Sequence, residues 1–175
     1  MSGGGTRGSY QMGVWQALHE MGLDQQIKVV TGASIGAING ALVVQQDWDL
    51  ALELWKNIQP HQIFDSIEGE FSYRTLIRDW YQNGAVRVNS FKTLLKKHLD
   101  ENIIRSSPID FGFVVYNKTL RKGQSLFPEL IPEGLLIEYI IASATFPIFQ
   151  AHRIGDFEYI DGGIHSILPT QIAFD

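Results

Sequence analysis

Cysteine is absent from the 175 residues of this chain. Its absence excludes disulfide bonds, thiolate catalysis and cysteine-containing zinc sites. A long run of one charge is missing too, because 14 Lys and Arg residues and 19 Asp and Glu residues give a net charge of −5. A basic surface for nucleic acid is therefore not expected, and we expect no nucleic-acid partner.

The chain also lacks a long uninterrupted apolar segment. Its most apolar stretch, residues 135–149, contains Glu138 and Pro147 and is too short and too interrupted to span a bilayer. No charged and then apolar segment of the signal-peptide type opens the chain. With 45% hydrophobic and 19% charged residues, residues 1–175 are expected to form one globular domain. We expect it to be cytoplasmic or peripheral to a membrane.

Strand-like and helix-like segments alternate along most of the sequence. We expect strands at 27–31, at 110–116 and on both sides of a Gly155-Asp156 turn, and helices at 10–21, 35–45, 49–57 and 132–143. Asp49 is predicted to cap its helix, and Pro132 is predicted to lie in the first turn of another. This alternation predicts an α/β fold.

Residues 59–102 break the alternation with an irregular helical pattern. Ser72 and Ser90 are predicted helix caps, and Gly84 is a predicted helix stop between them. We expect this segment to form a lid or cap region.

The first chemical motif is Gly32-Ala33-Ser34-Ile35-Gly36, between the predicted strand 27–31 and the predicted helix 35–45. A G-x-S-x-G sequence in this context predicts a nucleophile elbow, in which Gly32 and Gly36 leave room for a sharp turn. Ser34 would then lie at the carboxyl end of a strand, over a helix N-terminus. A tight turn without a nucleophile is the alternative interpretation.

A glycine-rich loop opens the chain, and Gly3, Gly5 and Gly8 match G-x-G-x-x-G. This pattern can bind a dinucleotide, but that fold needs an acidic residue after the next strand, where this chain has the Ser34 turn. Alternatively, its free amides could form an oxyanion hole, with Arg7 as a nearby positive charge. A flexible start without a ligand is a third interpretation.

The third motif is Asp161-Gly162-Gly163, which follows the apolar segment 157–160. A carboxylate at a strand end could serve as a base, and the two glycines would let other backbone come close. Taken alone, the same sequence is also typical of a simple turn.

In this order, the three motifs resemble the patatin-like phospholipase family over nearly the whole chain. The flanking segments 142–149 and 168–169 are similar as well. The resemblance implies a three-layer α/β fold with a central, mostly parallel sheet flanked by helices. It also implies a lipid acyl hydrolase of the phospholipase A type, acting on a lipid or ester substrate through a Ser–Asp dyad without a metal or cofactor.

Residue by residue, the resemblance makes Ser34 the nucleophile and Asp161 the base. The oxyanion hole would come from the glycine loop, namely Gly3, Gly4, Gly5, Arg7 and Gly8. Gly32 and Gly36 would belong to the elbow, and Gly162 and Gly163 to the aspartate motif.

Two departures from the family pattern leave other functions open. The family's first strand before Gly3 and its continuation after the aspartate motif are expected to be missing. An inactive lipid- or protein-binding module is therefore the main alternative, and a nucleotide-binding module is a third.

The histidines bear on the choice of catalytic base. An α/β-hydrolase triad would use His165, four residues after Asp161. We expect His165 to be a loop or pocket residue, because the acid and the histidine of such triads usually come from separate loops. The other histidines, His19, His61, His98 and His152, are expected to be structural or on the surface.

The apolar helix 133–143 is expected to be core.

Overall fold

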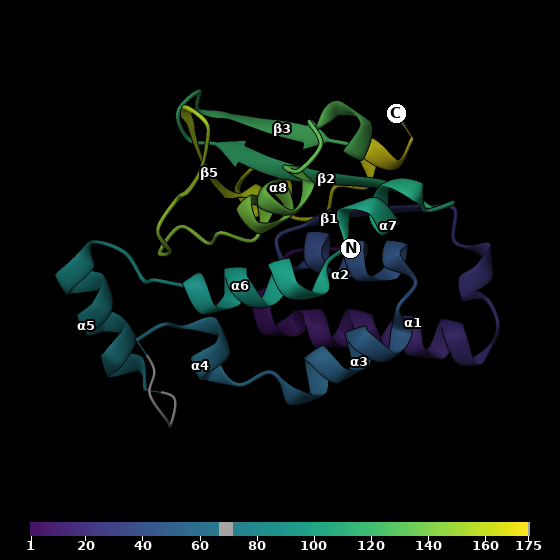
Figure 1. The fold of residues 1–175 in the computed structure, drawn as a ribbon, viewed down its shortest axis with the longest axis horizontal. Helices are drawn as coiled ribbons and strands as arrows, with labels where there is room; N and C mark the ends of the chain where they lie inside the picture. The colour runs from purple at the N-terminus through teal and green to yellow at the C-terminus, as the bar shows by residue number, and fades with distance from the viewer. Residues whose placement is uncertain (67–71, 175) are drawn as a thin grey trace.

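The computed structural model describes residues 1–66 and 72–174, which form a mixed α/β fold (Figure 1). The strands are β1 (Val29–Ala33), β2 (Asp110–Asn117), β3 (Lys122–Leu126), β4 (His152–Ile154) and β5 (Phe157–Asp161). The α-helices are α1 (Gly8–Glu20), α2 (Ile35–Gln45), α3 (Trp48–Asn57), α4 (Pro60–Ile63), α5 (Tyr73–Asn83), α6 (Asn89–His98), α7 (Glu101–Ser106) and α8 (Leu136–Ser143). Short 3-10 helices are η1 (Gly5–Arg7), η2 (Asp24–Gln26), η3 (Pro128–Leu130), η4 (Gly162–Ile164) and η5 (Gln171–Ala173). The predicted α/β class, with a sheet flanked by helices, is confirmed.

The sheet is organised around β2. Strand β1 pairs with β2 in parallel, whereas β3 and β5 pair with β2 antiparallel, and β4 pairs antiparallel with β5. The expectation of a mostly parallel sheet is therefore wrong for the strands that the structure describes. Two of the three antiparallel pairs, β2–β3 and β4–β5, follow from short turns, because a parallel pair needs a long crossover. The predicted β4–β5 turn is present, with Gly155 at φ 58°.

Helices α2 and α8 cover one face of the sheet. Their side chains pack with Val30, Phe113 and Val115 in the main hydrophobic core, and α2 is buried on all sides from residue 36 to residue 44. Helix α8 buries Leu136, Ile140 and Ile141, so the prediction that this segment is core is confirmed. The opposite face carries a small second cluster, in which Ala33 and Val114 pack with Ile172 of η5 and with Phe127.

Two predicted helix starts are wrong in detail. Asp47, not Asp49, caps α3, and its carboxylate accepts the Leu50 N–H at 3.0 Å. Helix α8 begins at Leu136 rather than at Pro132, because Gly134 has a φ of 82° that a right-handed helix cannot contain.

The segment 59–102 is helical as predicted, apart from residues 67–71, which lie outside the described residues. Ser72 occupies the N-cap position of α5, and Gly84 ends this helix in the left-handed conformation. Ser90 is not a cap, because α6 begins at Asn89 and the Asp65 carboxylate accepts the amides of both residues, at 3.1 and 2.8 Å. Among the described helices, none is long and apolar enough to cross a membrane.

Candidate active site

Ser34 lies between β1 and α2 in a backbone conformation that is unusual for a residue with a side chain. Its φ of 56° and ψ of −130° let the strand turn directly into the helix. A Cβ atom at Gly32 would lie 2.2 Å from the Gly36 carbonyl oxygen, and one at Gly36 would lie 2.5 Å from the Met1 carbonyl oxygen. Both glycines are therefore required by the close approach of backbone, which presents the Ser34 hydroxyl at a helix N-terminus.

Asp161 ends β5 and meets Ser34 from a position 127 residues later in the chain. Its Oδ2 accepts a hydrogen bond from the Ser34 hydroxyl at 2.5 Å. Its Oδ1 accepts the Gly163 N–H at 2.7 Å, so both carboxylate oxygens are held in place. A Cβ atom at Gly162 would lie 2.0 Å from the Val114 carbonyl oxygen, and this close contact sets the path of the chain after Asp161.

The Asp161 side chain is almost completely removed from water, with 5% of the residue exposed. Burial raises the pKa of Asp161 above the ordinary value of an aspartate, although the hydrogen bonds from Ser34 and Gly163 oppose the change. A carboxylate in this environment is a stronger base than one in water. It can therefore accept a proton from the hydroxyl that it contacts.

The glycine loop lies beside Ser34, and a Cβ atom at Gly3 would come within 3.2 Å of the Ser34 Cβ. The Gly3 N–H donates to the Ile167 carbonyl at 2.8 Å, whereas Gly4 and Gly5 donate to no backbone or side-chain acceptor in the described part of the chain. Gly4 and Gly5 have φ values of 152° and 57°, which residues with side chains rarely adopt. The loop thus exposes unpaired backbone amides next to the serine.

Arg7 and Gly8 do not line the cavity beside Ser34. The Gly8 N–H donates to the Gly5 carbonyl within the turn. Gly8 is also tightly packed, because a Cβ atom there would lie 2.7 Å from the Ile35 side chain. In the structure, Gly8 lets the glycine loop pack closely against α2.

Asn39, a residue without a predicted role, joins this loop to the helices behind it. It is fully buried, and its Nδ2 donates to the Gly8 carbonyl and to Gln11 Oε1, both at 3.0 Å. Its Oδ1 accepts the Trp55 indole N–H at 2.9 Å. The sequence signal for this network was Asn39 itself, the one polar side chain within the apolar segment 35–44.

Ser143 is the second residue that the sequence did not single out for a role. Its buried Oγ accepts the Ser34 N–H at 3.0 Å and donates to the Val114 carbonyl at 2.7 Å. It thereby fixes the backbone of the strained turn to the central strand. The sequence signal for Ser143 was its position. It lies in the segment 142–149, which resembles the patatin-like family, and at the end of a predicted core helix.

A cavity of about 660 Å³ opens beside Ser34 and Asp161. The polar end is formed by these two residues and the glycine loop. The remaining walls are apolar and come from α2, α3, α4, α6 and the loop after α8; they are Ile35, Ile38, Leu42, Leu54, Trp55, Ile58, Ile63, Phe64, Phe91, Leu94, Leu95, Ala144, Phe146, Pro147, Phe149, Ile164 and Ile167. The site thus combines one reactive polar end with a long hydrocarbon-like lining, which suits an acyl chain.

His165 lies away from the Ser34–Asp161 pair. Its ring covers Gly123 of β3, where an added Cβ atom would meet the ring at 2.0 Å. Within the described residues it makes no side-chain hydrogen bond to Ser34 or Asp161, as a triad would require. Of the other histidines, His152 is buried and bonds Glu138 at 2.8 Å, in agreement with the expected structural role.

The family model described as Patatin-like phospholipase matches residues 1–174. The chain belongs to the patatin-like phospholipase family, a family of lipid acyl hydrolases.

The crystal structure of VipD from Legionella pneumophila has a similar fold, with a TM-score of 0.66 over 96% of this chain at 18% sequence identity. The chain spans 46% of the length of VipD. Among curated protein sequences, none matches this chain.

Proposed function

We propose that this chain is a serine acyl hydrolase that cleaves acyl esters of lipids with Ser34 as nucleophile and Asp161 as base. The observation that carries the proposal is the 2.5 Å hydrogen bond between the Ser34 hydroxyl and Asp161 at the polar end of an apolar cavity. Family membership supports lipid substrates. An ester carbonyl can be positioned at Ser34 while its acyl chain lies along the apolar walls.

In the first half-reaction, the Ser34 oxygen attacks the carbonyl carbon while Asp161 takes the hydroxyl proton. The negative charge on the carbonyl oxygen is stabilised by the unpaired amides of Gly4 and Gly5. Collapse of this intermediate releases the alcohol, which takes the proton back from Asp161. An acyl group remains on Ser34.

In the second half-reaction, Asp161 removes a proton from water as the water oxygen attacks the acyl carbonyl. The same amides stabilise the second oxyanion. When it collapses, the fatty acid leaves and the proton returns to Ser34. No histidine is needed, because burial makes the Asp161 carboxylate more basic than usual.

The test is hydrolysis of p-nitrophenyl butyrate, a soluble ester, by the parent chain and by Ser34→Ala and Asp161→Asn. We expect Asp161→Asn to lose activity by about 10²–10⁴-fold, the usual contribution of a general base, and Ser34→Ala to lose at least as much. Ser106→Ala is the matched control, because this exposed serine only donates to backbone carbonyls within α7. It should retain full activity.

A His165→Ala variant separates the dyad from a triad. Because His165 covers Gly123 rather than Asp161, its removal should leave the rate nearly unchanged. A loss as deep as that of Ser34→Ala would reject the dyad. A parent chain that folds, as judged by circular dichroism, but hydrolyses no ester would instead support the lipid-binding alternative.

A further inference from the structure

Helix α5 turns large apolar side chains toward solvent. Ile77, Trp80 and Tyr81 are 66%, 52% and 84% exposed. The helix lies at one end of the molecule, away from the sheet (Figure 1). Soluble proteins usually place such side chains on the inner face of a surface helix, so this exposed face calls for an explanation.

A buried carboxylate, Asp79, joins α5 to the segment that follows the helix. Asp79 is 4% exposed, and its side chain accepts the Asn83 amide at 2.7 Å and the Arg87 N–H at 3.1 Å. The Arg87 guanidinium lies 3.6 Å from the same carboxylate. These contacts join the end of α5 to Arg87, two residues before α6 begins.

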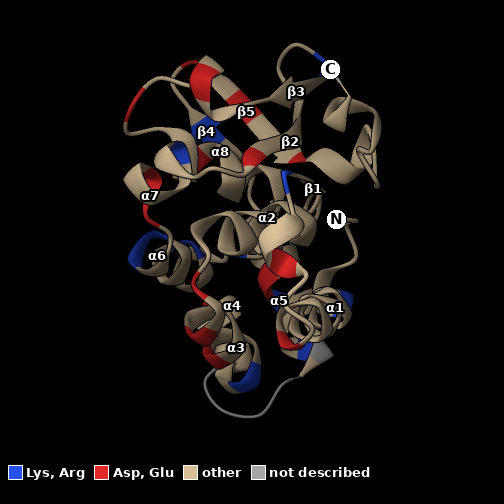
Figure 2. Cartoon of the chain, turned by 90° about the vertical axis from the view of Figure 1, so that its right-hand side faces the viewer, with Lys and Arg blue, Asp and Glu red and all other residues tan. Residues whose placement is uncertain are grey.

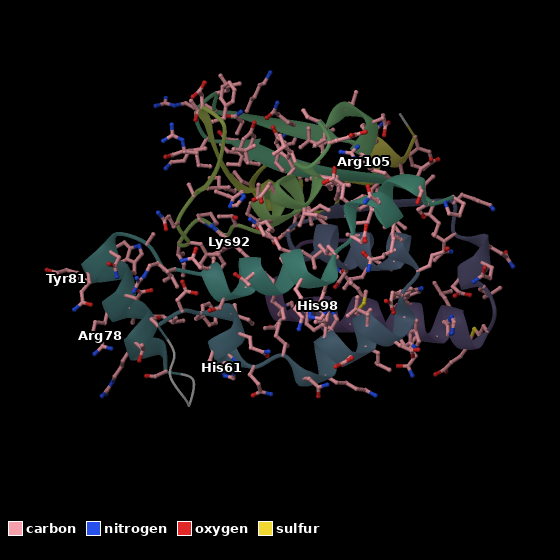
Figure 3. All side chains as sticks on the ribbon, viewed as in Figure 1. His61, Arg78, Tyr81, Lys92, His98 and Arg105 are labelled. Carbon is pink, nitrogen blue, oxygen red and sulfur yellow. The ribbon has the colours of Figure 1, made fainter. Side chains whose placement is uncertain are left out.

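The exposed charges on α5 are positive. Arg74 and Arg78 are both exposed, whereas the acidic residue of the helix, Asp79, is buried and paired. Arg78 and Tyr81 point away from the rest of the molecule (Figure 3). The chain as a whole is acidic, and charges of both signs are interspersed along it (Figure 2). Helix α5 thus combines exposed aromatic residues with arginines.

The segment that follows α5 pairs with the loop 146–150, part of which lines the Ser34 cavity. The Val86 N–H donates to the Ile148 carbonyl at 2.9 Å, and the Gln150 N–H donates to the Val86 carbonyl at 3.2 Å. Phe146, in the same loop, lines the cavity and is 53% exposed, and Ile148 is 42% exposed. The segment that follows α5 is thus hydrogen-bonded to the loop that carries the exposed side chains of Phe146 and Ile148.

We propose that α5 and the 146–148 loop dock this protein on a phospholipid surface. Trp80 and Tyr81 are amphipathic aromatic residues of the kind that insert at the level of lipid headgroups. Arg74 and Arg78 are placed to pair with lipid phosphates. The inference rests on the proposed function, because docking in this position brings the acyl esters of the lipid to the Ser34 cavity.

Binding is measured by co-sedimentation with vesicles of phosphatidylcholine and phosphatidylglycerol, in a Ser34→Ala background that prevents hydrolysis. We expect Trp80→Ala/Tyr81→Ala to reduce the vesicle-bound fraction at least tenfold, and Arg74→Glu/Arg78→Glu to reduce it to a similar extent. Controls are Leu130→Ala, an apolar residue with 67% exposure outside this surface, and Lys122→Glu, an exposed cation on β3. Both controls should bind like the parent.

Fluorescence gives a second readout that does not depend on sedimentation. Trp80 is the most exposed tryptophan in the described chain, so its emission should shift to the blue on addition of vesicles. The shift should disappear in Trp80→Phe. An unchanged shift in that variant would contradict insertion of α5.

Failure of docking and failure of the proposed function are distinguishable. The α5 variants should hydrolyse soluble p-nitrophenyl butyrate at the parent rate, because α5 contributes no residue to the cavity. A parent that binds vesicles through α5 but cleaves no ester would reject the catalytic proposal alone. The docking proposal would be overturned by a parent that does not sediment with vesicles, or by α5 variants that sediment like the parent. Either result would favour a protein as the partner of this surface.

Discussion

Ser34 is held in its strained conformation by two neighbouring glycines and by two side chains from distant parts of the chain. Gly32 and Gly36 allow the turn, Ser143 accepts its N–H, and Asp161 accepts its hydroxyl proton in a hydrogen bond. A residue other than glycine with a φ of 56° costs about 1–3 kcal/mol of conformational free energy, and the conformation persists only where the surrounding structure holds it. These contacts fix the position of the serine that we propose as nucleophile.

The pKa of Asp161 predicts how activity and stability depend on pH. Because burial raises this pKa, the base becomes ionised only at a higher pH than an ordinary aspartate, and the acid limb of kcat/KM should lie above the usual range of that residue. The limb should be absent from the residual rate of Asp161→Asn. A midpoint at or below the ordinary aspartate value would contradict the assignment.

The same pKa has a consequence for folding. A carboxyl group whose pKa is raised in the folded state stabilises the fold at low pH and loses that contribution as pH rises through the raised pKa. We therefore expect Asp161→Asn to be at least as stable as the parent at neutral pH, with an advantage that shrinks on acidification. Urea unfolding of both proteins across this pH range measures the difference.

Ser143 is predicted to position Ser34 rather than to react. Ser143→Ala leaves the Ser34 N–H and the Val114 carbonyl without their buried partner, so it should lower the free energy of unfolding by about 1–3 kcal/mol. Ester hydrolysis should fall with it, mainly in kcat, because the nucleophile is no longer fixed.

Ser107→Ala is the matched control for this prediction. The Ser107 hydroxyl donates to the Val44 carbonyl at 2.7 Å and lies outside the cavity lining. It should reduce stability without reducing kcat. Equal effects of the two variants on kcat would show that Ser143 acts through global stability only.

At the scale of elements, one buried amide connects the glycine loop with three helices. Asn39 of α2 bonds Gly8 and Gln11 at the start of α1, and it accepts the indole N–H of Trp55 in α3. The loop that carries the exposed amides of Gly4 and Gly5 is thereby joined to α2, the helix whose N-cap residue is Ser34. The loop can hold its position although it contains little apolar side chain of its own.

A double-mutant cycle of Asn39→Ala and Trp55→Phe tests this connection. Each single variant should destabilise the protein, Asn39→Ala by about 3 kcal/mol because several buried groups lose a partner at once. The two changes should be non-additive by about 0.5–3 kcal/mol, since they remove the same hydrogen bond. Additive changes in unfolding free energy would show that the bond contributes nothing to stability.

At the scale of the whole molecule, the cavity lies between two groups of elements. The sheet, α2 and the loop after α8 provide one side with Ser34 and Asp161, and α3, α4 and α6 provide the other with apolar side chains. Segments on both sides of residues 67–71 contribute, including Ile63 and Phe91. The predicted lid over 59–102 remains a prediction, but α4 and α6 of this segment form part of the cavity wall.

The apolar wall predicts a preference for longer acyl chains. Each methylene that enters the cavity should stabilise binding by about 0.8 kcal/mol, or about fourfold in kcat/KM. Leu94→Trp should shorten the preferred chain by filling space, while the butyrate rate stays near that of the parent. Ile103→Trp, a change at an exposed position of α7, should leave the preference unaltered. Parallel chain-length profiles for all three proteins would reject this assignment of the acyl site.

The sequence by itself determined the local chemistry. The sequence alone shows the glycines of the sharp turns and the strand–serine–helix order. Closely approaching backbone leaves no room for side chains at fixed positions along the chain, here Gly32, Gly36 and Gly162. The sequence also shows the apolar segments that became α2 and α8, since burial imposes composition along a continuous stretch. These features were sufficient for the family and for the α/β class.

Only the tertiary structure decided which residues meet. The contact of Ser34 with Ser143, the network around Asn39 and the pairing of β2 with β5 join positions far apart in sequence, and local patterns carry no information on such distances. The family resemblance implied the pairing of Ser34 with Asp161, but its geometry comes from the structure. Two of the sheet's antiparallel pairs, β2–β3 and β4–β5, are joined by short turns rather than by helical crossovers. The exposed face of α5 likewise became visible only when burial was known, because its apolar residues follow a helical pattern that normally predicts core.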